Sequence, residues 1–168
     1  ALGIPLNKNH EFIGDWLSFI NPFSIMVAVT SLALFMMHGA IYLSMKTENR
    51  LFAKTTILAK NFTIFFLIAF SVSSLYTLLY IPHLSDQLRS HPAYFILPII
   101  MFLAIANIPR QLNRRKYRFA FISSSITIAS VLAMVALEVF PVLLLASNDP
   151  ANSITITNAA SSLKTMKT

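Results

Sequence analysis

The sequence predicts an all-α integral membrane protein, folded as a bundle of four transmembrane helices. The chain of 168 residues is 56% hydrophobic and only 11% charged, whereas a soluble domain carries about 25% charged residues. Four apolar runs are long enough to cross a bilayer, which takes about 17–25 residues. None of these runs alternates like a barrel strand, and an unbroken apolar segment in lipid must pair its backbone internally, as a helix does.

The four predicted spans belong to a single membrane domain. They cover about 22–45, 62–81, 92–108 and 119–146, and residues 1–20 and 147–168 form extramembrane segments. The first and third spans open with proline, Pro22 after Asn21 and Pro92 after His91, at a position where the missing N–H costs no helical hydrogen bond. Asn21 is also a suitable N-cap. Because the chain begins with Ala1 rather than methionine, we interpret it as part of a longer protein.

Basic side chains are concentrated in two connections. Segment 46–60 holds four basic side chains and one acidic one, and segment 110–118 holds five basic side chains and no acidic one. Positive loops stay cytoplasmic, so we expect both segments inside the cell and both chain ends outside. The protein is then a multi-pass protein of the inner, cytoplasmic membrane of a bacterial or archaeal cell. These loops account for the net charge of +7, and no nucleic-acid partner is expected.

Small residues indicate where the helices approach one another. They are Ser125, Ala129 and Ala133 in the fourth span, with Ser123, Ser124 and Thr127 nearby, and Ser71, Ser73 and Ser74 in the second. The hydroxyls are interpreted as bundle contacts, with ligand binding as the alternative. Small side chains allow two helix backbones to come close in a membrane. Gly39 in the first span is expected to permit close packing in the same way.

Three polar residues inside the spans are candidates for chemistry. Glu138 either has a function, as a proton-relay residue or by binding a polar headgroup through water, or is a near-interface glutamate that is protonated or reaches toward water. The near-interface interpretation is favoured. His38 is either an axial haem ligand or a histidine bonded to a neighbouring helix or loop. The lack of a second histidine within the spans favours the hydrogen-bonding role. Asn107, close to Arg110, is expected to bond at the end of the third span.

No catalytic signature is present in the sequence. There is no Walker loop, dinucleotide-binding fingerprint, zinc-ligand spacing or nucleophile elbow. The absence of cysteine excludes disulfides and thiolate chemistry. We therefore predict no catalytic, cofactor-binding or metal-binding residue in this chain.

Several stretches together resemble one known family. They are Gly3-Ile4-Pro5-Leu6, then Leu17-Ser18-Phe19-Ile20-Asn21-Pro22-Phe23, then His38-Gly39-Ala40-Ile41-Tyr42-Leu43 with Lys46-Thr47-Glu48, and finally Asn152-Ser153-Ile154-Thr155-Ile156. In order and spacing they resemble subunit II of the cytochrome bd quinol oxidases over nearly the whole chain. The family-motif positions are Asn21, Pro22, His38, Gly39, Lys46 and Thr47.

The resemblance implies a non-catalytic subunit of a terminal respiratory oxidase, which oxidises quinol and reduces dioxygen. Haem b and haem d are expected in the partner, subunit I, and subunit II of some members holds a structural quinone. Membrane lipid is a further expected contact. The family's subunit II resembles two four-helix bundles and a peripheral helix, of which this chain matches the second bundle.

Two candidate residues fit this family pattern poorly. Glu138 has no counterpart in it, which weakens the relay interpretation. The pattern admits glutamine in place of His38, which argues against haem ligation. The alternative to the oxidase function is a free-standing small four-span membrane protein, such as a transporter or an assembly factor.

Overall fold

The computed structural model describes residues 3–8, 11–15, 20–80, 95–140, 142–144, 146–156 and 159, without the side chains of residues 138, 139 and 150. The chain divides into two compact units. The helical unit is Pro22–Met134, and the terminal unit combines Ala1–Asn21 with Val135–Thr168. The terminal unit therefore brings together segments from opposite ends of the sequence.

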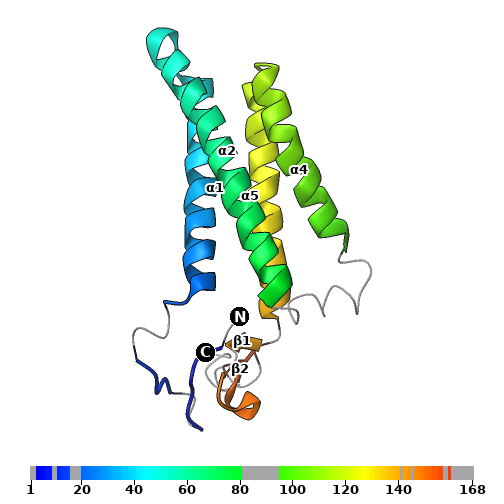
Figure 1. The fold of residues 1–168 in the computed structure, drawn as a ribbon. Helices are drawn as coiled ribbons and strands as arrows, with labels where there is room; N and C mark the ends of the chain where they lie inside the picture. Colours follow the sequence, from blue (N-terminus) through cyan, green and yellow to red (C-terminus); the bar gives the residue numbers. More distant parts are fainter. Residues whose placement is uncertain are drawn as a thin grey trace, which may run out of the picture. The chain divides into compact units, whose positions relative to one another are not determined.

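Four long helices run through the described part of the chain (Figure 1). They are α1 (Pro22–Lys46), α2 (Asn49–Tyr80), α4 (Ile96–Asn113) and α5 (Tyr117–Val139). Each is long and apolar enough to cross a membrane. The prediction of an all-α membrane protein with four transmembrane helices is therefore confirmed.

Helix α1 agrees closely with the predicted first span. It begins at Pro22 and ends at Lys46, one residue beyond the expected end. The link to α2 is short, and Thr47 stabilises it, since its hydroxyl oxygen lies 3.1 Å from that of Thr55. Asn49 opens α2 with a φ of 52°, a left-handed conformation that Asn adopts more readily than most residues. The first two spans therefore form a tight helical hairpin.

Helix α2 is longer than the predicted second span. It begins at Asn49 rather than near residue 62 and contains 32 residues, which corresponds to about 48 Å at about 1.5 Å per residue. The hydrocarbon layer is only about 30 Å thick, so the first turns, with Arg50 and Lys54, extend beyond the apolar part. The apolar pattern marks where lipid contact begins, and the helix continues past that point because its hydrogen bonds are internal.

Helix α4 continues through a proline at which the third span was expected to stop. It ends at Asn113 rather than Ile108, with Pro109 inside it. Pro109 has no N–H and so offers no helical hydrogen bond to the Ile105 carbonyl, but the turns on both sides are kept. The turn to α5 places Arg115 at a φ of 56°. The expected start near residue 92 lies outside the described residues.

Helix α5 ends earlier than the predicted fourth span. It covers Tyr117–Val139, whereas a helix from about 119 to 146 was expected. Phe140 precedes Pro141 in the sequence, and a residue before proline is disfavoured in helical conformation. Residues Val142–Leu144 form strand β1. The predicted last turns of this span are therefore wrong.

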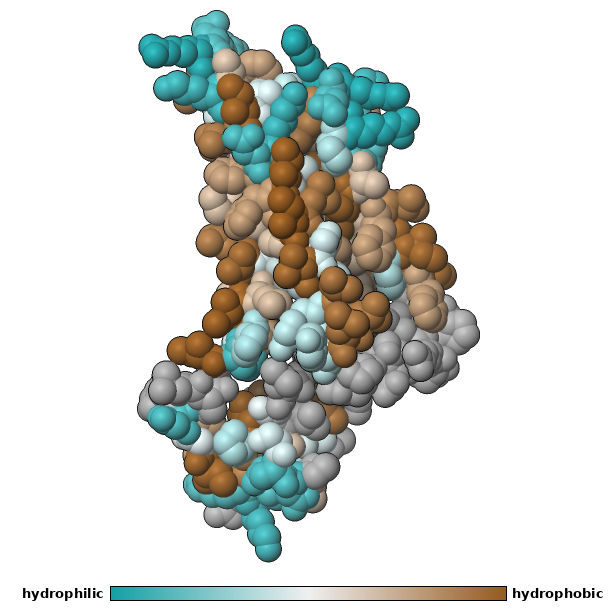
Figure 2. All heavy atoms as spheres, viewed as in Figure 1, coloured by the Kyte–Doolittle hydropathy of each residue, from teal (hydrophilic) through white to brown (hydrophobic). Residues whose placement is uncertain are grey.

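The helical unit has a narrow core and a broad apolar surface. The largest fully buried side chains of α1, α2 and α4 are Met37, Ile41, Phe66, Ile108 and Leu112. Large apolar side chains remain exposed along all four helices, such as Phe35 at 62% and Leu103 at 67%. Figure 2 shows this apolar surface along the helices, with hydrophilic side chains at the turns that join α1 to α2 and α4 to α5. An apolar outer surface is what a lipid environment requires.

The terminal unit contains short strands where polar extramembrane segments were expected. Strand β1 pairs antiparallel with β2 (Ile154–Thr155), and the short 3-10 helix η4 (Pro150–Asn152) lies between them in sequence. The N-terminal segment joins this structure through a parallel bridge between Ile4 and Ala146. The two ends of the described chain therefore fold as one unit.

Candidate functional site

A series of polar side chains links three helices of the helical unit. On α1, His38 Nδ1 lies 2.8 Å from Ser124 Oγ of α5. On α4, Asn107 Nδ2 donates to Ser123 Oγ at 2.8 Å, and Gln111 Nε2 donates to Asn107 Oδ1 at 3.0 Å. Because Ser123 and Ser124 are adjacent in α5, these five residues form one polar layer within an apolar bundle.

The geometry of His38 is that of a hydrogen-bonding residue between helices. The Ser124 hydroxyl donates to the Phe121 carbonyl oxygen at 2.8 Å. A hydroxyl has one hydrogen, so the remaining bond is donated by His38 Nδ1–H. The imidazole also stacks on the Phe121 ring, with 4.6 Å between ring centroids. The bond agrees with a histidine bonded to a neighbouring helix. It involves Nδ1 alone, and metal-ligating histidines also donate their second ring N–H, so the choice between the two roles stays a prediction.

Within the described residues, no group of three or more His, Cys, Asp or Glu side chains is arranged to hold a metal ion. Glu138 belongs to α5, but its side chain lies outside the described residues. Its two proposed roles, proton relay or near-interface carboxylate, therefore stay predictions.

The buried face of α5 includes the expected contact residues Ser123, Ser124 and Thr127 but not the whole predicted stripe. In the predicted stripe of Ser125, Ala129 and Ala133, Ala129 is exposed. The buried residues of α5 are Ala120, Ser123, Ser124, Thr127 and Ser130. Thr127 donates to the Ser123 carbonyl oxygen at 3.0 Å, so its hydroxyl is satisfied by its own helix. The expected small-residue packing is present, but on a face that carries hydroxyls.

One of the three serines expected at helix contacts makes such a contact. Thr30 Oγ1 on α1 lies 2.7 Å from Ser73 Oγ on α2. Ser71 and Ser74 are exposed, and the Ser71 hydroxyl donates to the Leu67 carbonyl oxygen of its own helix. Exposed hydroxyls in an apolar helix are satisfied in this way without a partner helix.

Most of the family-motif positions lie at the ends of α1. Asn21 precedes the helix, and Pro22 and Lys46 are its first and last residues. Thr47 follows the helix, and its hydroxyl donates to the Leu43 carbonyl oxygen. Among the described residues, a β-carbon placed at Gly39 would meet no atom within 4 Å. Gly39 therefore does not bring two of the described helices together, and close packing against a helix of another subunit stays a prediction.

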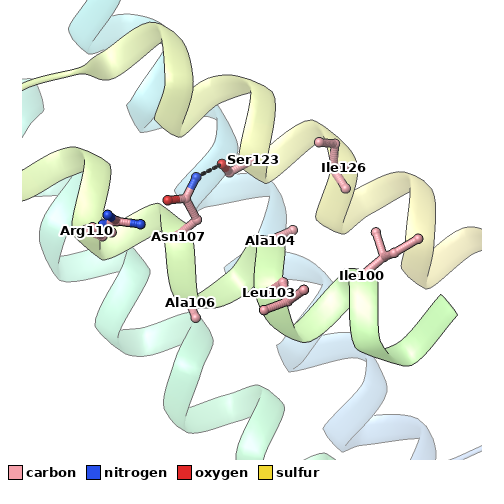
Figure 3. A pocket seen from close by; sticks show the side chains of 8 residues that line it. All are labelled: Ile100, Leu103, Ala104, Ala106, Asn107, Arg110, Ser123 and Ile126. Atoms are coloured by element: carbon pink, nitrogen blue, oxygen red, sulfur yellow. Dashed lines mark hydrogen bonds between the residues drawn. The ribbon is translucent and has the colours of Figure 1, made fainter. Parts of the chain in front are cut away.

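A groove of about 500 Å³ opens between α4 and α5, beside the polar layer (Figure 3). Its apolar lining includes Ile100, Leu103 and Ile126, and its polar lining includes Asn107, Arg110 and Ser123. Figure 3 shows Asn107 reaching from α4 to Ser123 on α5, with Arg110 on the next turn of α4. Asn107 thus bonds across to another helix, and its expected role at a helix end is wrong, since α4 continues to Asn113.

A usable signal for the polar layer was present in the sequence. Asn107 and Gln111 are four residues apart and therefore share one face of a helix. An amide inside an apolar span must find a hydrogen-bond partner, since leaving it unpaired is costly. The sequence did not show that the partner is Ser123, because that choice depends on how α4 and α5 pack.

The first and last motif stretches meet in the terminal unit. Asn148 Nδ2 donates to the Leu6 carbonyl oxygen at 2.8 Å, and Leu6 N donates to Asn148 Oδ1 at 3.2 Å. Asn152 Nδ2 also donates to the Leu6 carbonyl oxygen, at 3.3 Å. Leu6 is only 1% exposed. No local pattern predicts a contact between residues 142 positions apart, and Asn148 was missed for that reason.

Comparison with known proteins gives the family. The family model described as cytochrome bd terminal oxidase subunit II matches residues 1–168. The chain is 26% identical to the "Probable cytochrome oxidase subunit 2" of Haemophilus influenzae and 22% identical to the "Cytochrome bd-I ubiquinol oxidase subunit 2" of Escherichia coli K12. Each alignment covers 98% of this chain but 51% of the relative, so the chain spans about half the length of these curated relatives. With four membrane-spanning helices and a family match along its whole length, the chain belongs to the cytochrome bd terminal oxidase subunit II family.

Proposed function

We propose that this chain is part of a non-catalytic subunit of a terminal respiratory oxidase, which couples quinol oxidation to dioxygen reduction. Its partner is subunit I, which carries haem b and haem d. The observation that carries this proposal is the family match over residues 1–168. The polar side chains described inside the bundle support a structural role, because they bond to one another between helices.

The surface of α2 is suited to contact with a partner subunit or with lipid. Only 11% of its 18-residue apolar segment is buried within the chain. A helix pairs its own backbone groups, so its exposed apolar side chains can contact lipid or another membrane helix. The supporting role therefore consists of presenting apolar helices to subunit I.

We also propose that segments 46–60 and 110–118 face the cytoplasm and that residues 1–20 and 147–168 face the opposite side of the inner membrane. The excess of basic side chains in the two segments supports this orientation. The bridge between Ile4 and Ala146 supports a common side for the segments before α1 and after α5. Four crossings bring the chain back to the side from which it started.

Purification of the full-length gene product in mild detergent tests the oxidase proposal. We expect a larger partner subunit to co-purify and the reduced-minus-oxidised visible spectrum to show haem d. A colourless preparation containing this subunit alone would contradict the proposal and favour the free-standing four-span protein.

A further inference from the structure

The groove between α4 and α5 has a polar end and an apolar end. Arg110 is exposed, and its guanidinium has no ion pair with any residue that the structure describes. Asn107 uses one amide N–H toward Ser123 and its carbonyl oxygen toward Gln111, which leaves its second N–H available. The polar end therefore offers donors and a positive charge but no negative charge of its own.

The apolar end is lined by side chains that are poorly covered by the protein. Ile100 is 43% exposed, Leu103 67% and Ile126 41%. Ile100 and Arg110 are ten residues apart in α4, which corresponds to about 15 Å along the helix. That distance is half of the hydrocarbon layer of about 30 Å, the depth that the acyl chains of one leaflet fill.

The surrounding charge selects the kind of ligand. The turn after Arg110 adds Arg114, Arg115 and Lys116 on the same end of the helix pair, with no acidic residue between 110 and 118. Basic pockets between transmembrane helices on the cytoplasmic side bind anionic lipid headgroups. A phosphate accepts strong, charge-assisted hydrogen bonds from a guanidinium, and a neutral quinone would leave Arg110 without a counter-charge.

We propose that the α4–α5 groove binds one anionic phospholipid, with its phosphate at Arg110 and Asn107 and an acyl chain along Leu103, Ile100 and Ile126. This lipid site needs the membrane topology but not the oxidase activity. The volume of about 500 Å³ lies within the range of about 300–1,000 Å³ that is typical of ligand sites.

Lipid binding to the delipidated full-length complex tests the site. Phosphatidylglycerol is titrated and bound lipid is counted by native mass spectrometry, with phosphatidylcholine of the same acyl chains as the neutral comparison. Arg110→Gln is expected to weaken phosphatidylglycerol binding about tenfold, the loss of one charge-assisted hydrogen bond. Arg50→Gln removes the same charge from the other basic segment, outside the groove lining, and is the matched control, expected to change binding by less than about twofold.

Three results would overturn the proposal. The Arg110→Gln and Arg50→Gln variants could weaken binding equally, which would indicate diffuse attraction to the basic side chains of both segments. The two lipids could bind equally, or a quinone could occupy the groove and compete with the lipid. If Arg110→Gln fails to assemble, a phosphatidylglycerol with a photoreactive acyl chain is used on the unaltered complex. We expect label on α4 and α5 at Leu103 or Ile126, and label found only on other helices would refute the site.

Discussion

At the scale of single residues, the structure assigns roles to side chains whose chemistry was evident but whose partners were not. A lone histidine in an apolar helix needs a hydrogen-bond partner, and this much followed from the sequence. That Ser124 accepts the bond and Phe121 covers the ring depends on the packing of α1 against α5. The same holds for Asn107, whose need for a partner was predictable and whose partner Ser123 was not.

Replacing His38 tests its structural role. We expect His38→Gln to leave the haem content of the complex unchanged, because a glutamine amide can donate to Ser124 as Nδ1–H does. His38→Leu removes the donor and is expected to lower stability by about 1 kcal/mol, read as a lower melting temperature in detergent. Loss of one haem from an assembled His38→Gln complex would instead make His38 a ligand.

At the scale of the helices, the sequence predicted the number of spans correctly. It was less accurate about the residues at which the helices end and about the faces that they bury. Hydropathy reports contact with lipid, so the aqueous start of α2 at Asn49 gave no apolar signal. The two prolines had different effects. Pro109 is accommodated within α4, whereas α5 ends before Pro141. The burial of Ser123, Ser124 and Thr127 in α5 agrees with the expectation that these side chains lie at bundle contacts, whereas the exposure of Ala129 does not.

The buried face of α5 can be tested with one pair of substitutions. Thr127 is completely buried, so Thr127→Leu overfills the helix contact and is expected to destabilise the protein by about 1–3 kcal/mol. Ala129 is exposed two residues further along α5, on nearly the opposite face, and Ala129→Leu should be tolerated. Thermal unfolding of both variants in the same detergent makes the comparison. Equal destabilisation, or a larger effect at Ala129, would show that the buried face is assigned wrongly.

At the scale of the whole molecule, composition and charge predicted the membrane class and the number of crossings. They did not predict the terminal unit, because its strands are short and their partners are far apart in sequence. Leu6 and Asn148 illustrate this limit. Nothing near Leu6 marks it as a buried residue, and its burial depends on side chains that follow the fourth span.

The orientation in the membrane can be tested directly, since the chain has no cysteine. Single cysteines at Arg114 and Asp149 should react with an impermeant thiol reagent from opposite sides. Arg114→Cys is expected to react only in inverted membrane vesicles and Asp149→Cys only in intact spheroplasts. Labelling of both positions from one side would contradict the proposed topology.

The pairing of Leu6 with Asn148 also has a consequence for biosynthesis. The two residues are 142 positions apart, and at roughly 5–20 residues per second a ribosome takes about 7–28 seconds to make the intervening chain. During that interval Asn148 has not yet been synthesised, so the backbone of Leu6 lacks this hydrogen-bond partner. The contacts that tie Leu6 into the terminal unit therefore form only after α5 has been synthesised.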